Sequence, residues 1–384
     1  MRGKLTVLLV TAFVDMLGLI IVYPLLALYA TRLGATAGTV GILVAAFSVA
    51  QLVSAPAWGR MSDRYGRRPA ILFGLLVSAV AYVIFAFAGS IWLLLVSRLI
   101  QGLGGGTIGV VQAYVADISV EKDRAKALGW LSAVTSLGAV VGPAIGSILV
   151  RIGGYSAPGL GSAILCVLVS AFAWRYLRES RTDTAQFEAM HSPAPKSTSA
   201  IRDVIARPDL PASRLIWIYT VAIGAFYGTT PLLPLILAER LGATTENVGY
   251  FIVYLGGMGV IVRTGILSRV IERWGEARVA RTGLVLLAIG LAMVAAIRSY
   301  PTMLISLTLM PMGTAFTFPC VTAMLSRVVP GKQRGLYMGV QHTFGGVSRV
   351  AFPLIAGYGM DLFGQGIPFV FAGVMVLATL LLTA

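Results

Sequence analysis

Four side chains that are charged at neutral pH lie deep inside long apolar stretches of this sequence: Asp15, Arg98, Arg263 and Arg349. Asp15 lies about ten residues into the first stretch, roughly 15 Å deep at ~1.5 Å per helical residue. A charge at the bilayer centre costs at least ~2.5–3.5 kcal/mol, so an acid there faces a cavity or is neutralised. We expect Asp15 to carry protons; the alternative is a neutral carboxyl group that ties two helices together.

The composition of the chain is that of a membrane protein. Of its 384 residues 57% are hydrophobic and only 12% are charged, and the mean hydropathy is +0.86. Because a helix needs ~20 apolar residues to cross a bilayer, we expect twelve spanning helices near residues 5–28, 38–59, 69–89, 91–117, 126–150, 158–177, 214–238, 247–268, 279–298, 301–326, 335–360 and 366–384. The first apolar run is too long for a signal peptide, so we expect it to be retained.

The net charge of +15 and the pI near 10.2 do not indicate a nucleic-acid-binding protein, because the cations are sorted along the chain. Most of the 30 Lys and Arg residues fall in alternate loops, and the other loops hold only Arg32, Arg151, Arg240 and Arg298. By the positive-inside rule, the basic loops and both termini face the cytoplasm. The sequence therefore predicts a multi-pass protein of the plasma (inner) membrane.

No sequence pattern points to an enzyme or a metal site. Cys166 and Cys320 each lie in an apolar stretch, and no Cys/His spacing suits a metal ion. The sequence also lacks a P-loop and a nucleophile elbow. We expect neither enzymatic activity nor a metal or cofactor, and any pumping must draw on an ion gradient rather than on ATP.

The chain reads as two halves, 1–178 and 214–384, joined by a polar cytoplasmic linker, 179–213, with a short amphipathic helix near Ile201–Ala206. The halves repeat with an offset of 210 residues. The matching residues are Gly18 with Gly228, Pro24 with Pro234, Arg124 with Arg334, Gly129 with Gly339, and Pro143 with Pro353.

The repeat is most informative where it breaks. Asp15 matches Ala225 and Arg98 matches Thr308, while Arg349 has no charged counterpart in the first half. Structural needs should be shared by both halves, so these singular ionisable residues are better candidates for function. The long side chain of Arg98 could reach the depth of Asp15; the alternative is that it snorkels outward.

The loop Gly59–Pro69 carries four arginines and one acid, Asp63. It resembles the signature G-x-L-x-D-R-x-G-R-R-P of the major facilitator superfamily, which joins transmembrane helices 2 and 3, with Met61 in place of Leu. The resemblance implies an all-α membrane protein with twelve transmembrane helices in two pseudo-symmetric six-helix bundles. Arg98–Gly104 resembles the superfamily's motif R-x-x-Q-G-x-G, whose Arg is linked to proton coupling.

The resemblance gives this loop a gating role. It implies that Asp117 pairs with Arg67 and that Asp63 faces the start of helix 11, near Leu336–Met338, which would hold the halves together on the cytoplasmic side. The expected gating residues are Gly59, Asp63, Arg64, Gly66, Arg67, Arg68 and Asp117. The alternative, a charge cluster that only sets topology, explains the cations but not Asp63.

A series of small residues in the fifth stretch resembles the antiporter motif G-x8-G-x3-G-P-x2-G-G. It comprises Gly129, Gly138, Gly142, Pro143 and Gly146, and Ser147 replaces the last glycine. Small residues at this spacing favour close helix packing, and proline bends a helix. Together with Asp15–Gly18 and Tyr23–Leu26, which look like the start of tetracycline-efflux-like proteins, the motif implies a drug/proton antiporter driven by the proton gradient.

The substrate is predicted only by class. Candidate binding residues are the polar or aromatic groups Gln51, Gln112, Tyr227, Tyr254, Phe316, His342 and Arg349. The predicted spans hold one deep acidic residue and two or three deep cationic ones. This balance favours a neutral, zwitterionic or weakly anionic small amphiphile as the substrate over a polycation. We expect a monomer that exports such a solute by alternating access and can confer antibiotic resistance. The alternatives are a proton-coupled sugar or metabolite transporter, a lipid flippase, and a receptor or assembly factor without transport.

Overall fold

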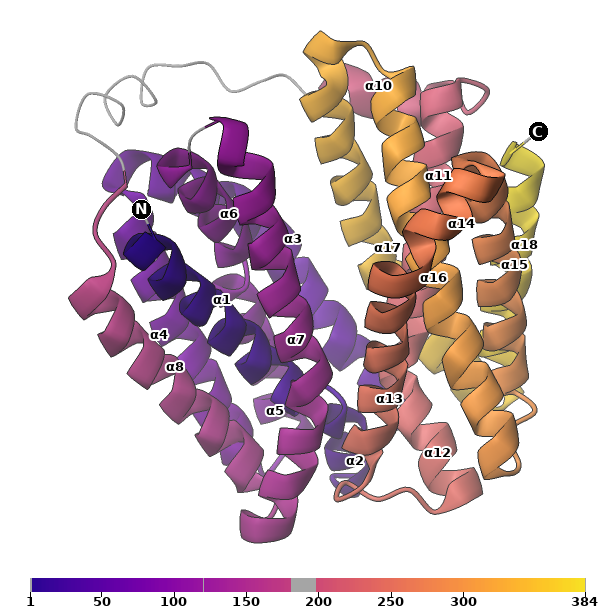
Figure 1. The fold of residues 1–384 in the computed structure, drawn as a ribbon. Helices are drawn as coiled ribbons and strands as arrows, with labels where there is room; N and C mark the ends of the chain where they lie inside the picture. Colours follow the sequence, from indigo (N-terminus) through magenta and orange to yellow (C-terminus); the bar gives the residue numbers. More distant parts are fainter. Residues whose placement is uncertain (1, 120, 181–197, 384) are drawn as a thin grey trace. The chain divides into compact units, whose positions relative to one another are not determined.

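The computed structural model describes residues 2–119, 121–180 and 198–383, and every regular element within these ranges is helical (Figure 1). By length and composition, ten helical segments of this part of the chain could cross a bilayer. Two further segments, α17 (Arg334–Phe363) and α18 (Ile367–Ala378) with η4 (Thr379–Thr383), occupy the last two predicted spans. The predicted all-helical architecture is confirmed, and twelve spans are consistent with it.

The chain forms two compact units. Unit 1 consists of Met1–Gly34, Ala46–Pro193 and Thr245–Val253. Its helices are α1 (Arg2–Val22), α2 (Leu25–Arg32), most of α3 (Ala37–Tyr65), α4 (Arg67–Ala86), α5 (Ile91–Gly104), α6 (Thr107–Ile118), α7 (Glu121–Gly153) and α8 (Ser156–Tyr176), with the start of α13 (Val248–Ile261).

Unit 2 consists of Ala35–Ala45, Ala194–Thr244 and Tyr254–Ala384. Besides α17, α18 and η4, it contains the start of α3, the rest of α13, and the elements α10 (Thr198–Ala206), α11 (Pro211–Thr229), η1 (Thr230–Leu232), α12 (Leu233–Leu241), η2 (Val262–Ile266), α14 (Leu267–Trp274), α15 (Glu276–Val294), α16 (Tyr300–Val328) and η3 (Gly331–Gln333). Each unit thus includes the first turns of a helix whose remainder belongs to the other.

Helices break where proline or glycine residues weaken the backbone hydrogen bonding of the helix. The first predicted span divides into α1 and α2 at Pro24, which has no N–H to donate. The matching span of unit 2 divides at η1, which contains Pro231 and is followed by Pro234. The fourth span divides at Gly105–Gly106, where α5 ends and α6 begins. Both units therefore have a helix break near corresponding positions of their first spans.

The amphipathic helix predicted near Ile201–Ala206 is present as α10. Its inner face is set by Ala200 and Val204, which are both buried, while Ile205 is exposed. The indole nitrogen of Trp217 in α11 donates to the carbonyl oxygen of Val204 at 3.2 Å. The middle of the predicted linker, 181–197, lies outside the described residues, so the domain limits proposed from the sequence stay a prediction.

Candidate functional site

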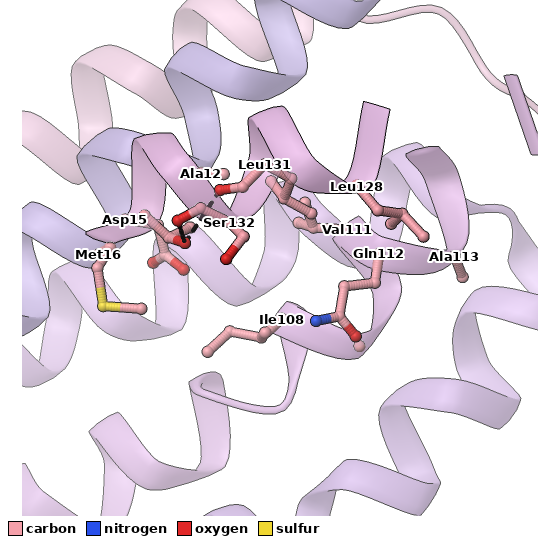
Figure 2. A pocket seen from close by; sticks show the side chains of 12 residues that line it. Ala12, Asp15, Met16, Ile108, Val111, Gln112, Ala113, Leu128, Leu131 and Ser132 are labelled. Atoms are coloured by element: carbon pink, nitrogen blue, oxygen red, sulfur yellow. Dashed lines mark hydrogen bonds between the residues drawn. The ribbon is translucent and has the colours of Figure 1, made fainter. Parts of the chain in front are cut away.

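A cavity of about 600 Å³ lies in unit 1 between α1, α6 and α7 (Figure 2). Its volume falls within the ~300–1,000 Å³ range of ligand pockets. The residues that line it are Ala12, Asp15, Met16, Ile108, Gly109, Val111, Gln112, Ala113, Leu128, Leu131, Ser132 and Thr135. A few polar groups on an apolar wall suit an amphiphilic ligand, and Asp15 supplies the acidic group.

The glycine series of α7 fixes α1 close to this cavity. A Cβ atom on Gly138 would lie 2.9 Å from the carbonyl oxygen of Phe13, and one on Gly146 would lie 2.4 Å from that of Ile21. Gly142 faces the side chain of Ile20, whose Cβ would be 3.1 Å away. At Gly138 and Gly146 only a residue without a side chain permits this approach of α7 to α1, the helix that carries Asp15.

Ser147, which departs from the expected glycine, has a specific partner. Its fully buried hydroxyl group donates to the carbonyl oxygen of Thr245 at 2.9 Å and accepts the N–H of Gly249 at 3.0 Å. A Cβ atom on Gly249 would lie only 2.0 Å from the carbonyl oxygen of Pro143. Ser147 therefore satisfies an otherwise unpaired amide in the first turn of α13.

Arg98 is buried rather than directed outward, with 1% of its surface exposed. Its guanidinium carbon lies 5.7 Å from the centre of the Phe85 ring, and its Nε atom has no hydrogen-bond partner among the described residues. Within the same part of the chain, no ion pair joins Arg98 to Asp15. The snorkelling alternative is therefore wrong, while the expected role of Arg98 in proton coupling stays a prediction.

The signature loop forms a compact charge cluster around Arg67, which is 6% exposed. One terminal nitrogen of Arg67 lies 2.7 Å from Asp63 and also donates to Ser62 at 2.6 Å. Nε of Arg67 donates to Asp117 at 3.1 Å, so the predicted Arg67–Asp117 pair is present. The expected position of Asp63 opposite Leu336–Met338 involves both units and stays a prediction.

Glu179 completes the cluster, although sequence reasoning treated it only as the start of the linker. Its carboxylate accepts the backbone N–H groups of Arg67 and Arg68 at 2.9 and 3.0 Å, which caps the start of α4. Gly66 precedes them with φ of 102°, and a Cβ atom there would lie 2.4 Å from Glu179. No local sequence pattern pointed to this role, because α4 has no capping side chain of its own and its cap comes from a distant residue.

Comparison with known proteins decides the family. The sequence matches the family described as Major Facilitator Superfamily over residues 8–271 and 264–384. The chain belongs to the Major Facilitator Superfamily. It is accordingly a membrane transporter and not an enzyme.

Individual relatives of this superfamily match almost the whole chain. Multidrug resistance protein 1 of Bacillus subtilis (strain 168) is 28% identical over 380 residues, 99% of this chain and 95% of the relative. The class B tetracycline resistance protein of Escherichia coli is 25% identical over 358 residues, 92% of this chain and 88% of the relative. Among solved structures, the nucleoside transporter NupG has a TM-score of 0.80 at 12% identity, with 100% of this chain and 99% of that chain covered. That likeness shows the fold alone.

Of the predicted binding residues, Gln112 lines the large cavity, beside Asp15, the predicted proton carrier. Gln51 lies beside a smaller cavity, where its amide nitrogen donates to the carbonyl oxygen of Gly105 at 3.1 Å. Sequence reasoning missed Ser132 and Thr135, which line the large cavity from α7. Their spacing of three residues places them on one face of α7, but the sequence alone does not show that this face lines a cavity.

The remaining predicted binding residues belong to unit 2. Tyr254 shares a hydrogen bond of 2.7 Å with Thr308, Phe316 is buried, and Nε of Arg349 donates to the carbonyl oxygen of Gly345 at 3.2 Å. The rings of Tyr227 and His342 belong to an aromatic group that also contains Tyr219 and Phe318, which were not predicted. Their part in binding stays a prediction.

Proposed function

We propose that the protein is a proton-coupled antiporter that exports a small amphiphilic, drug-like solute by alternating access. The observation that carries the proposal is the position of Asp15, an acid deep in a spanning helix and on the wall of a 600 Å³ cavity. An ionisable group in such a place marks an ion or substrate path. The α7 glycine series, which resembles the antiporter motif, lies directly behind it.

The names of the relatives support the substrate class. They include multidrug, tetracycline and quinolone resistance proteins, which match 92–99% of this chain at 24–28% identity. The cavity suits such solutes because its wall is mostly apolar and carries a few hydrogen-bonding groups, Gln112, Ser132 and Thr135 beside Asp15. We assign the solute a neutral, zwitterionic or weakly anionic character.

In the proposed cycle, Asp15 binds either a proton or, in its ionised form, a polar group of the solute. Arrival of solute from the cytoplasm favours release of the proton inward, and opening to the outside reloads Asp15. The proton gradient is the energy source, so no cofactor is required. The Arg67 cluster with Asp63 and Asp117 gates the cytoplasmic side, because its ion pairs can be made in one state and broken in the other.

Binding in this proposal involves both halves of the chain, as for transporters built from parallel repeats. Gln112 contributes from the first half. The other proposed contributors are Gln51, Tyr227, Tyr254, Phe316, His342 and Arg349. The proposed setting is a monomer in the plasma (inner) membrane with both termini in the cytoplasm, as the sorting of basic loops indicates.

The test is growth protection of drug-sensitive bacteria that express the protein. A panel of tetracycline, fluoroquinolones and dyes is applied with and without a proton uncoupler. We expect protection against at least one compound, with lower cellular accumulation, and loss of the accumulation difference when the uncoupler is added. Protection that survives the uncoupler would contradict proton coupling, and a lack of any flux difference would contradict export.

A further inference from the structure

A second cavity of about 20 Å³ lies beside the large one in unit 1, and Asp15, Met16 and Ile108 line both. The residues that line only the small cavity are Leu19, Phe47, Gln51, Ser78, Tyr82, Gln101 and Gly105. A polar cavity of about 10–15 Å³ or more can hold one water molecule if two to four polar partners are present. This cavity thus has room for a water molecule but not for a drug-like solute.

Gln101, one of the residues that line this cavity, has a hydrogen-bonding atom without a partner among the described residues. Its side chain is 2% exposed, and its amide nitrogen donates to the hydroxyl oxygen of Tyr82 at 2.9 Å. Its Oε1 atom is buried and has no hydrogen-bond partner among the residues that the structure describes. An unpaired buried acceptor is costly, so a donor at this place is expected.

Neither Gln51 nor Tyr82, which line the same cavity, supplies that donor. The amide nitrogen of Gln51 is directed to the carbonyl oxygen of Gly105 at 3.1 Å. The Tyr82 hydroxyl group accepts from Gln101, so its own proton points to a different acceptor. A water molecule in the cavity meets both needs, since it can donate to Gln101 and accept from Tyr82 or Asp15.

We propose that the small cavity holds one ordered water molecule that links Oε1 of Gln101 to the carboxyl group of Asp15. Gln101 and Tyr82 are then positioning residues for the proton that Asp15 carries, and the inference rests on the proposed function. The water donates to Asp15 when the carboxyl group is ionised and accepts from it when it is protonated. Asp15 therefore keeps a hydrogen bond in both states while its other side stays open to the solute.

The functional test uses the full-length protein in liposomes with tetracycline, or with the compound that gives the strongest protection in cells. Gln101→Met keeps the side-chain volume but removes both amide atoms. We expect accumulation driven by a pH gradient to fall about fivefold or more, and the pH midpoint of transport to move by about 0.5 or more. Downhill exchange of the solute should stay within about twofold, because the large cavity is unchanged.

Gln341→Met is the matched control. Gln341 in α17 is also fully buried and also has an unpaired Oε1 atom among the described residues, but it does not line either Asp15 cavity. We expect it to leave the pH midpoint unchanged. If Gln101→Met changes neither the pH midpoint nor the driven accumulation, or if it lowers driven and downhill transport equally, the positioning role is wrong.

Two further measurements separate this inference from the proposed function and from misfolding. An experimental structure of the native protein that resolves waters should show one within hydrogen-bond distance of Gln101 Oε1, and an empty cavity would overturn the proposal. Failure of Asp15→Asn to alter driven transport would overturn the proposed proton carrier itself. If Asp15→Asn abolishes accumulation driven by a pH gradient while Gln101→Met leaves it unchanged, only the water site is overturned.

Discussion

Two corresponding helix pairs, α1 with α7 in unit 1 and α11 with α17 in unit 2, are both closely packed, but the small residues are on opposite partners. In unit 1 they lie on α7, where Gly142 faces Ile20 of α1. In unit 2 the residue that matches Gly142 is Phe352, and it fills the space left by Gly224 and Gly228 of α11. The same scaffold can thus be packed in two ways.

The difference has a consequence for the site. In unit 1 the first helix presents Asp15 to a cavity, whereas in unit 2 the matching Ala225 is fully buried. Arg98 of unit 1 is matched by Thr308, which is neutral and bonded to Tyr254. Close packing is common to both units, but at the matching position of the first helix unit 1 has an acid beside a cavity and unit 2 has a buried alanine.

A second contrast lies at the ends of matching helices. Asp117 of unit 1 pairs with the buried Arg67, and its counterpart Arg327 pairs with Glu276 at 2.7 Å with the charges reversed. The Arg327 side chain is 72% exposed, whereas that of Arg67 is 7% exposed. The two pairs should therefore differ in strength, because solvent screens the exposed one.

The largest expected effect is that of Gly146→Leu, which removes the contact between α7 and α1. Its Cβ atom would meet a backbone carbonyl that cannot move aside, so destabilisation should exceed ~3 kcal/mol, beyond ordinary overpacking. The measurement is thermal unfolding of protein purified in detergent. Gly129→Leu is the control, because nothing lies within 4 Å of a Cβ atom there. Equal stability of the two variants would refute the packing account.

The next effect is that of placing an acid in unit 2. Ala225→Asp should lower the free energy of unfolding by about 2.5–3.5 kcal/mol. Residue 225 is fully buried and lines neither of the Asp15 cavities, so the new carboxyl group would have no open space beside it. Asp15→Ala should leave thermal stability nearly unchanged, since it removes a charge from the wall of a cavity. Expression and thermal unfolding measure both. An Ala225→Asp protein as stable as the native one would show that unit 2 has polar room at this position.

A smaller effect is expected for Arg67→Gln. It removes charge-assisted hydrogen bonds to Asp63 and Asp117 that are partly screened, so the loss of stability should be about 1.5–3 kcal/mol. Transport turnover should fall more than solute affinity, because the role proposed for the cluster is gating and not binding. Loss of affinity in proportion to turnover would argue against gating.

The smallest effect is expected for Arg327→Gln, the matched change in unit 2. Exposed ion pairs contribute about 0.2–1 kcal/mol, and salt screens them. Unfolding at low and high ionic strength should therefore show a slight loss that disappears in salt. A loss as large as that of Arg67→Gln would remove the contrast between the two clusters.

The sequence predicted the parts of this molecule that depend on local pattern. Apolar runs located the spans, and the repeat register placed Asp15 against Ala225. The pair of Arg67 with Asp117 followed from a family signature. These features need no knowledge of which side chains meet across helices.

What escaped prediction depends on tertiary contact. Glu179 caps α4 from 112 residues away from Arg67, and Ser147 binds Gly249 of a distant helix. Ser132 and Thr135 look like ordinary surface residues of a helix until the cavity is known. Buried Arg98 could not be distinguished from an outward-pointing one, because both fit the same position in the sequence.

The central claim is that Asp15 carries the coupled proton, and one measurement tests it most directly. Purified native and Asp15→Asn proteins are reconstituted in liposomes, and solute accumulation is followed with a pH gradient as the only driving force. We expect Asp15→Asn to retain solute binding and downhill exchange but to lose accumulation against the gradient, because Ala225 offers no second acid at the matching position. If the Asp15→Asn protein still concentrates solute using only the pH gradient, the proton travels elsewhere and the account is wrong.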